Sequence, residues 1–548
     1  MPDLILGPVL RHVGRDDATV WVETDAPCEV EVLDHSEGTF TVAGHHYALV
    51  CIENLKPREL HPYEVRLDGR AVWPPPDYDF PAPAIRTLGD GGPLRVAFGS
   101  CRVALPHHPP YTLPKDEHPD GREFDALYTL ARELRGSPRE SWPDLLLMLG
   151  DQVYVDEGSP AARERIRATR DVGEPPGEEV AGFEEYTWLY HESWSDPTIR
   201  WLFSTVPTAM VIDDHDMADD WNISRSWKEE MARTPWWHER LVGGLMTYWI
   251  YQHIGNLSPQ ELAHHEEYDA VRRADDGAAA LREFVEWVDS NGEGKVWSFK
   301  RDLGRTRLVV VDDRTGRSFR EGRRSIFDDH EWDWIQDACR GDFDHLLFAT
   351  TDPVLLPPGL HYVEAWSEAV CDGAWGARAV ALGEKLRRAA DFDHWASFRV
   401  SFERFERLLH EVAGGERGRP PASVVILSGD VHHAYLAEVA FRRGAGVGSA
   451  VYQAVCSPFR NALDTHERLT LRFALTPPGR ALGRSLARAA GARDPDIRWR
   501  LVEGPFFDNQ VATITLDDRR AELKLEKTVG DPQSDRRSLE TVFERLLA

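Results

Sequence analysis

The sequence has few cysteines and no cysteine pair of the kind that binds metal ions. Its six cysteines are scattered over 548 residues without a CxxC spacing. This pattern excludes a zinc ribbon and a dense disulfide framework. Five of them are expected to be small buried apolar side chains, at positions 28, 51, 339, 371 and 456.

Long apolar runs and an excess of basic residues are missing as well. No stretch approaches the ~20 apolar residues that a membrane span needs. The first residues contain no basic region followed by a long apolar segment, and no twin arginine, so we expect a cytoplasmic protein without membrane contact. The formal net charge of -28 argues against nucleic acid or an anionic membrane as partner. The oligomeric state cannot be predicted.

The sequence also lacks the Gly-x-Ser-x-Gly elbow of serine hydrolases. The nearest candidate, Gly446-Val-Gly-Ser-Ala, does not match it, so the sequence argues against an α/β-hydrolase with a nucleophilic serine.

The chain does have an apolar content of 42%, which is enough for a large core. We expect a small domain at 1–90 and a large one at 91–548 with helical insertions.

The first 90 residues are typical of short strands. Polar and apolar residues alternate over 18–24, 29–33 and 47–52, which predicts a small antiparallel β-sandwich of the fibronectin type III kind. Proline-rich segments at 74–76 and 81–83 are expected to form a stiff linker to the larger domain.

From residue 94 onward, short apolar runs end repeatedly in polar residues. Runs of this type suit strands that are buried on both faces of a parallel sheet, with helices between them. The predicted strands end near 100, 150, 212, 311, 350 and 428, and the predicted helices span 122–136, 329–341 and 397–413. Residues 160–205 and 225–290 are expected to be helical, and the tail to form strands at 511–516 and 521–526 and a helix at 539–547.

The polar residues at these strand ends predict a metal cluster. Carboxyl ends of parallel strands share one edge of a sheet, so the acids should crowd together, at a high cost unless cations neutralise them. The strand ends carry Cys101-Arg102, Gly150-Asp151, Asp213-Asp214-His215-Asp216, Asp312-Asp313-Arg314, Asp352 and Gly429-Asp430-Val431-His432.

In four of these segments the sequence resembles the PhoD-type alkaline phosphatases, a branch of the calcineurin-like metallophosphoesterases. The matching segments are Ser100-Cys101, Gly150-Asp151-Gln-Val-Tyr154, Asp213 to Asp216, and Ser428-Gly429-Asp430-Val431-His432. The resemblance implies an α/β fold, a four-layer αββα sandwich behind the small β domain. It also implies hydrolysis of phosphate monoesters or diesters by a metal-activated hydroxide, with a small phosphate ester as substrate.

The resemblance further implies a role for individual residues. Asp151 resembles the carboxylate that bridges two metals, and Cys101 and Tyr154 resemble ligands of Fe(III). Asp430 and His432 resemble the last pair of ligands, Asp214 stands where related enzymes have a ligating Asn, and Asp352 is a further candidate. His215 resembles the group that protonates the leaving oxygen, Asp216 its orienting partner, and Arg102 and Arg314 are candidate phosphate clamps.

The expected metals are Fe(III) and Ca(II), with Zn, Mn or Mg as alternatives. Asp219-Asp220-Trp221 stands where the family commonly has an Asn pair, and the additional carboxylates favour hard cations such as Ca(II). His394 is a further candidate on the substrate side. A non-enzymatic alternative is a binding or scaffold protein with a structural metal site. His215 beside the acids argues against it, because a closed structural site needs no acid.

Overall fold

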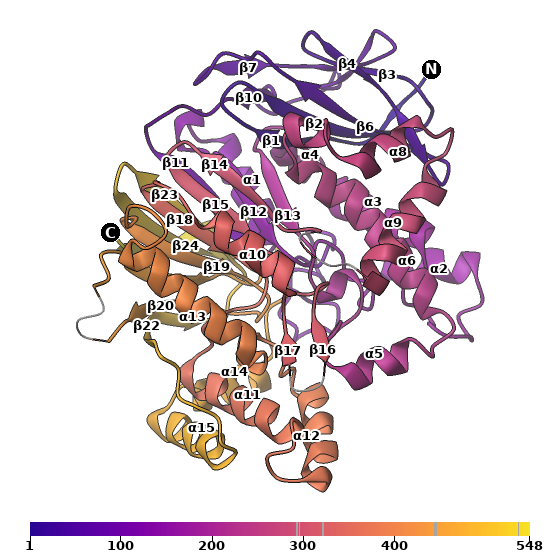
Figure 1. Cartoon of the computed structure of the whole chain (residues 1–548). Coiled ribbons are helices and arrows are strands. Elements are labelled where there is room, and N and C mark those ends of the chain that lie inside the picture. The colour runs from indigo at the N-terminus through magenta and orange to yellow at the C-terminus, as the bar shows by residue number, and fades with distance from the viewer. Residues whose placement is uncertain (292–293, 295, 321–322, 443–445, 535) are drawn as a thin grey trace.

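Two β-sheets form the centre of the molecule (Figure 1). The computed structural model describes residues 1–548 except 292–293, 295, 321–322, 443–445 and 535. Among the described residues the first sheet has six strands, in the order β13 (Thr208–Val211), β12 (Leu145–Leu149), β11 (Leu94–Gly99), β23 (Gln510–Asp517), β24 (Arg520–Gly530) and β25 (Arg537–Leu546). The second, counted likewise, has seven, in the order β14 (Phe299–Leu303), β15 (Thr306–Val310), β18 (His345–Ala349), β19 (Ser423–Ser428), β21 (Ala450–Val455), β20 (Ala434–Ala440) and β22 (Arg498–Phe506).

Each of the two sheets contains a run of neighbouring parallel strands. In the first sheet β12 pairs in parallel with β11 and with β13, and in the second β18 pairs in parallel with β15 and with β19. The apolar runs are fully buried, as five consecutive leucine and methionine residues in β12 illustrate. Because parallel strands end at one edge, the loops that follow them bring the predicted polar residues together.

Apolar side chains on both faces of each sheet create four layers. One cluster lies between the sheets and includes Leu147, Leu347 and Val425. The outer face of the first sheet packs against α1 (Ala126–Arg135), α3 (Phe183–Trp194), α4 (Pro197–Phe203) and α6 (Trp237–Thr247). The outer face of the second packs against α10 (Asp329–Ala338) and α13 (Arg399–Gly414). The predicted αββα sandwich is confirmed.

The N-terminal region forms two small antiparallel sheets around their own core. Their strands are β1 (Leu4–Val13), β2 (Ala18–Thr24), β6 (His45–Ile52) and β5 (Phe40–Val42) in one sheet, and β4 (His35–Gly38), β3 (Glu29–Val32), β8 (Val65–Leu67) and β9 (Arg70–Trp73) in the other. Buried residues of both, such as Val20 and Val30, share one cluster. This confirms a β-sandwich, and β7 (Leu60–Pro62) pairs beside it with β10 (Ala84–Arg86). The division at residue 90 stays a prediction.

The remaining segments are mostly helical. The expected helices within 160–205 and 225–290 are present, and Trp194, Trp201 and Trp249 among them are buried packing residues. The helices not yet named are α2 (Pro160–Thr169), α5 (Arg225–Met231), α7 (Pro259–Leu262), α8 (Glu266–Arg273), α9 (Ala278–Asn291), α11 (Pro358–Cys371), α12 (Ala377–Ala389), α14 (Thr465–Ala474) and α15 (Pro477–Ala489). A π-helix covers Tyr248–His253, and β16 (Ser318–Arg320) pairs with β17 (Arg323–Ser325).

The structure overturns one predicted element. Residues 539–546 of the helix expected at 539–547 belong to β25, the edge strand of the first sheet. Leu, Glu and Arg favour helix locally, but pairing with β24 along its length gives the backbone other hydrogen-bond partners, and this tertiary context overrides a weak local preference.

Among the described residues, no helix has both the length and the apolar character needed to cross a bilayer.

Candidate metal centre

The loops beyond the parallel strands hold several residues in a left-handed backbone conformation. The φ angles are 56° at Cys101, 52° at Asp151, 63° at Asp430 and 51° at His432. Residues other than glycine reach this region at a cost, and such positions concentrate at functional sites. Four predicted site residues therefore share an unusual backbone as well as a common location.

Glycines allow these loops to approach one another. A Cβ atom at Gly150, whose φ is 95°, would collide with the side chain of Asp213. A Cβ atom at Gly429 would collide with the hydroxyl of Ser100. Gly150 thus permits close contact between the ends of neighbouring strands β12 and β13 in the first sheet, and Gly429 between the ends of β19 and β11 in the two sheets.

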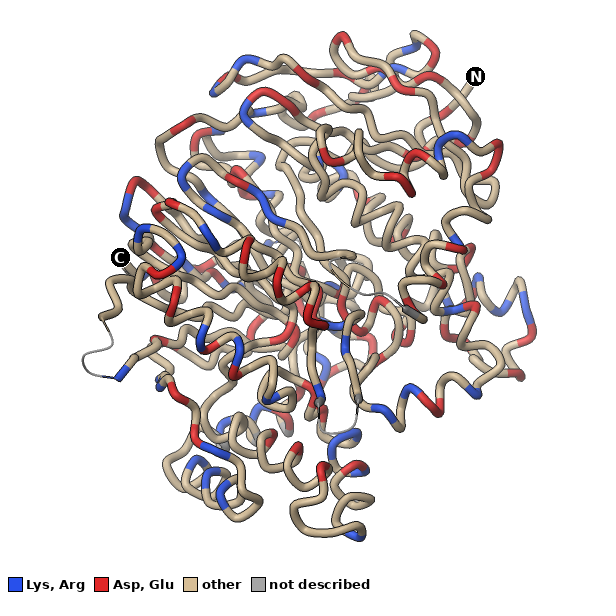
Figure 2. The backbone as a smooth tube through the Cα atoms, viewed as in Figure 1, with Lys and Arg blue, Asp and Glu red and all other residues tan. Residues whose placement is uncertain are grey.

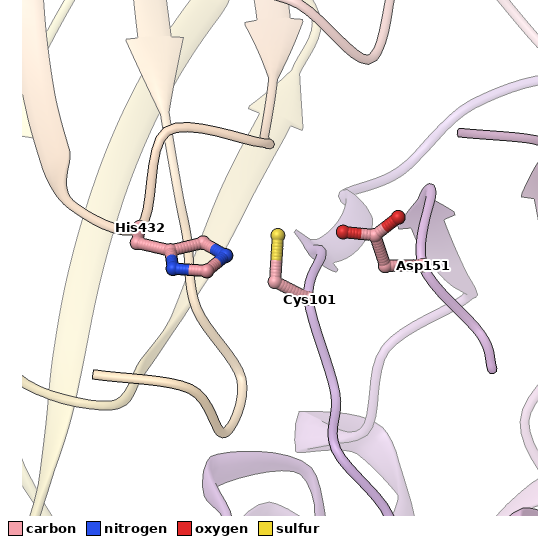
Figure 3. A group of neighbouring side chains, drawn as sticks. All are labelled: Cys101, Asp151 and His432. Carbon is pink, nitrogen blue, oxygen red and sulfur yellow. The ribbon is translucent and has the colours of Figure 1, made fainter. Parts of the chain in front are cut away.

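One group of side chains combines sulfur, carboxylate and imidazole ligands. Figure 3 shows the Cys101 sulfur between the His432 ring and the Asp151 carboxylate, and ligand atoms of all three lie within 4.8 Å of one another. The Tyr154 hydroxyl lies 3.2 Å from Asp151 Oδ2. The structure therefore brings together four of the predicted metal ligands, including Cys101 and Tyr154, the two expected to bind Fe(III).

A second group consists of carboxylates alone. Oxygen atoms of Asp151, Asp213, Asp214 and Asp430 lie within 4.8 Å of one another. Asp151 Oδ1 and Asp213 Oδ2 are buried and accept no hydrogen bond from any described residue. Figure 2 shows acidic positions gathered near the middle of the molecule. Asp213 was not among the predicted ligands, although it belongs to the same acidic run as Asp214.

The electrostatics of this group fit bound cations. Burial raises the pKa of Asp151 well above its ordinary value, and the charges of Asp214, Asp216 and Asp430 raise it further. Burial likewise raises the pKa of Asp214. A cation in contact with these oxygens would replace the lost hydration and neutralise the mutual repulsion. The buried, unpartnered oxygens of Asp151 and Asp213 therefore fit metal binding.

The predicted proton donor has a carboxylate partner, but a different one from that expected. His215 Nδ1 lies 3.0 and 3.1 Å from the two oxygens of Asp156, and its ring centroid lies 4.4 Å from that of Tyr154. Burial lowers the pKa of His215, but Asp156, Asp214 and Asp151 together outweigh it and raise the pKa well above its ordinary value. These carboxylates, with Asp156 the largest contributor, favour the protonated imidazole.

Asp216, the predicted partner of His215, is hydrogen-bonded to backbone groups instead. Its carboxylate accepts hydrogen bonds from the backbone N–H groups of Gln152, Val153 and Asp213. These bonds tie the turn after β13 to the loop after β12. Asp156, only two residues after Tyr154 in the sequence, takes the orienting position instead.

Arg314 lies within the acidic centre as a counter-ion. Its Nε donates to Asp213 Oδ1 at 2.6 Å, its Nη1 pairs with Asp393, and its Nη2 donates to Asp352 Oδ1 at 2.9 Å and to Asp430 Oδ1 at 3.3 Å. Every nitrogen of this buried guanidinium thus already contacts a carboxylate. This placement balances part of the acidic charge, and the predicted role of Arg314 as a phosphate clamp stays a prediction.

Arg102 is also engaged elsewhere. Its Nε donates to Asp125 Oδ2 at 2.8 Å, and its Nη1 donates to the backbone oxygen of Ser193 at 2.8 Å. The side chain is only 4% exposed. In the structure the buried Arg102–Asp125 pair fixes the loop after β11, and the predicted role of Arg102 as a phosphate clamp stays a prediction.

His394 and Asp352 border the centre on the side of the second sheet. His394 Nδ1 lies 2.7 Å from Glu364 Oε1, and its Nε2 lies 3.4 Å from Asp430 Oδ2. Asp352, His394 and Asp430 form a further group whose ligand atoms lie within 4.8 Å. Asp352 already contacts Arg314 and Arg317, so its charge is balanced by the protein.

Comparison with family models supports the resemblance seen in the sequence. Residues 121–322 match the PhoD-like phosphatase model, which confirms the predicted likeness to this family. Residues 1–85 match the model described as Domain of unknown function (DUF7800). A comparison with curated proteins finds no match.

Solved structures show a related fold. The structure of PhoD matches with a TM-score of 0.59 and 12% identity, over 99% of this chain and 92% of that one. The structure of the purple acid phosphatase PPD1 from yellow lupin (Lupinus luteus) seeds matches with a TM-score of 0.48 and 10% identity, over 95% of this chain and 71% of that one. The likeness to PhoD establishes the fold over nearly the whole chain.

Proposed function

We propose that this protein hydrolyses phosphate esters with the help of metal ions bound at the strand ends. The observation that carries the proposal is the pair of buried, unpartnered oxygens, Asp151 Oδ1 and Asp213 Oδ2, within one group of four acids. The PhoD-like phosphatase match over residues 121–322 supports the same reaction.

The ligand types suggest two different cations. Cys101, Tyr154, Asp151 and His432 offer thiolate, phenolate, carboxylate and imidazole, a set that suits Fe(III). Asp151, Asp213, Asp214 and Asp430 offer oxygen only, which suits Ca(II) or another hard divalent ion. Asp151 belongs to both groups and would therefore help to hold both cations.

The bound cations would polarise the phosphoryl group, take up developing negative charge and lower the pKa of a bound water. The protein supplies the proton. His215, held protonated by Asp156 and 16% exposed, donates the proton on Nε2 to the oxygen of the leaving alcohol. Asp156 keeps Nδ1 occupied, so Nε2, which lies 3.8 Å from the exposed Asp219, is the nitrogen left to donate to the leaving group.

A structural metal site in a binding or scaffold protein is the alternative. A partly exposed, protonated imidazole at the edge of the acid group has no purpose in a closed structural site. We therefore favour hydrolysis, with phosphate monoesters and diesters both as candidate substrates.

Turnover of chromogenic phosphate esters tests this proposal. Purified protein should hydrolyse nitrophenyl phosphate or bis(nitrophenyl) phosphate, lose that activity on exhaustive chelation, and regain it when metal ions are returned. Hydrolysis that survives complete removal of metal, or no hydrolysis of either ester by the metal-loaded protein, would contradict the proposal.

A further inference from the structure

Two serine hydroxyls lie against the sulfur of Cys101. Ser100 Oγ is 3.0 Å from Sγ, and Ser457 Oγ is 3.1 Å from it. The cysteine and both serines are completely buried. The sulfur thus has two O–H groups as direct neighbours on its protein side.

Backbone hydrogen bonds fix these hydroxyls in place. The backbone N–H of Phe459 donates to the backbone carbonyl of Ser100 at 2.7 Å, and that of Arg460 donates to the backbone carbonyl of Cys101 at 3.1 Å. The segment with Ser457 therefore runs alongside the cysteine loop. On its other side the Ser457 carbonyl accepts from Gln510 Nε2 at 2.8 Å. These backbone contacts therefore hold both serines close to the sulfur.

Both serine hydroxyls can donate a hydrogen bond to the sulfur. Ser100 Oγ accepts the backbone N–H of Asp430 at 2.9 Å, which leaves its own proton available for the sulfur. Ser457 Oγ donates to the sulfur as well. A thiol would give its one proton to the Asp430 carbonyl, 3.3 Å from Sγ, and the sulfur can accept from both hydroxyls as a thiol or as a metal-bound thiolate.

Figure 3 shows the sulfur between Asp151 and His432, whose ligand atoms lie within 4.8 Å of it, so a cation would contact the sulfur from the side of these two residues. A thiolate that binds metal here keeps these two hydrogen bonds, because they come from the side of the protein.

We propose that Ser100 and Ser457 are positioning residues that donate hydrogen bonds to the Cys101 thiolate and weaken its electron donation to the bound metal. Such bonds to a ligating sulfur raise the reduction potential of the metal and move the sulfur-to-metal absorption to higher energy. The inference rests on the proposed function, because it requires Cys101 to be a ligand. In this inference the two serines adjust the reduction potential of the metal, a role that we do not assign to the carboxylates.

The absorption spectrum of the metal-loaded protein tests this role independently of activity. In protein loaded with Co(II) or Fe(III), Ser457→Ala should shift the sulfur-to-metal band to longer wavelength with unchanged metal content. Ser100→Ala should shift it in the same direction, and it serves if Ser457→Ala does not fold. Ser428→Ala is the matched control, because Ser428 is buried beside the centre and its hydroxyl has no hydrogen-bond partner among the described residues.

Two results separate this inference from the proposed function. A sulfur-to-metal band in the wild type that neither serine variant shifts would overturn the inference and leave Cys101 as a ligand. A spectrum that Cys101→Ser does not change would contradict ligation by Cys101 itself, and the inference would fall with it.

Discussion

Two buried carboxylates in this molecule differ in how completely their oxygens are hydrogen-bonded. Glu23, between the N-terminal sheet and the helical layer, has both oxygens occupied: Oε1 by His45 at 3.2 Å, and Oε2 by His191 and the Tyr251 hydroxyl, each at 2.9 Å. Asp151, equally buried, has one oxygen without any hydrogen bond from the described residues.

The pKa values follow the same division. Burial raises the pKa of Glu23, but the hydrogen bonds from His191, His45 and Tyr251 outweigh it and hold the pKa below its ordinary value. At Asp151 burial dominates and raises the pKa. A buried carboxylate that belongs to the fold receives its partners from the fold, whereas one that lacks them fits a partner from solution.

The largest expected effect comes from removing the Asp151 carboxylate. Asp151→Asn should reduce phosphate-ester hydrolysis to background, because it removes the charge shared by both ligand groups. Asp144→Asn is the matched control, since Asp144 precedes the same strand at its opposite end and pairs with Arg86. Steady-state rates on a nitrophenyl ester measure both, and equal activity in the two variants would contradict the assignment of Asp151.

The next effect concerns proton donation by His215. General acids contribute about 10²–10⁴-fold in rate, so His215→Ala should lose about that factor on an alkyl phosphate ester. The loss on a nitrophenyl ester should be clearly smaller, because nitrophenolate leaves with little need for a proton. Equal losses on the two esters, with metal content unchanged, would show that His215 is not the donor.

The third effect concerns Asp156, whose replacement should shift the pH dependence of kcat/KM. Its negative charge raises the pKa of His215. Asp156→Asn should therefore lower that pKa and move the alkaline limb of the kcat/KM profile to lower pH, since the protonated imidazole is the active form. Asp216→Asn is the comparison: it removes backbone contacts and should lower thermal stability while the limb stays in place. A limb that moves with Asp216 and not with Asp156 would reverse the two assignments.

The smallest effect is expected at Glu23. Its hydrogen bonds, with those of Glu184, raise the pKa of His45 to about 9. A group whose pKa is raised on folding stabilises the protein fully below its unfolded value of roughly 6.5, and this contribution is lost as the pH rises through about 9. Glu23→Gln should flatten the decline of Tm over this window. Thermal unfolding at a series of pH values measures it, and an unchanged slope would contradict the coupling.

The sequence was most informative where one run of residues determines both strand and site. The five apolar residues of β12 followed by Gly150 and Asp151 predict a buried strand, a turn and an acid at the sheet edge, and the structure has all three. The C-terminal strand β25 could not be foreseen, because its partner β24 supplies the hydrogen bonds that override local helix preference.

The sequence also could not predict which side chains from different loops pair with one another in the folded protein. Spacing alone does not distinguish Asp156 from Asp216 as the carboxylate beside His215, because the choice depends on how the loop after β12 folds over the turn after β13. The position of Arg314 among Asp213, Asp352, Asp393 and Asp430 likewise depends on three loops meeting in space. The acidic run around Asp213 did indicate where such partners would gather.

Metal content is the most direct test of the difference between the two acidic sites. Elemental analysis of the purified wild type, Asp151→Asn, Asp144→Asn and Glu23→Gln should find bound metal in stoichiometric amounts in the wild type and in the last two variants. Asp151→Asn should have lost it while remaining folded. A metal-free wild type after reconstitution with Fe and Ca, or an Asp151→Asn variant with the full complement, would contradict the account.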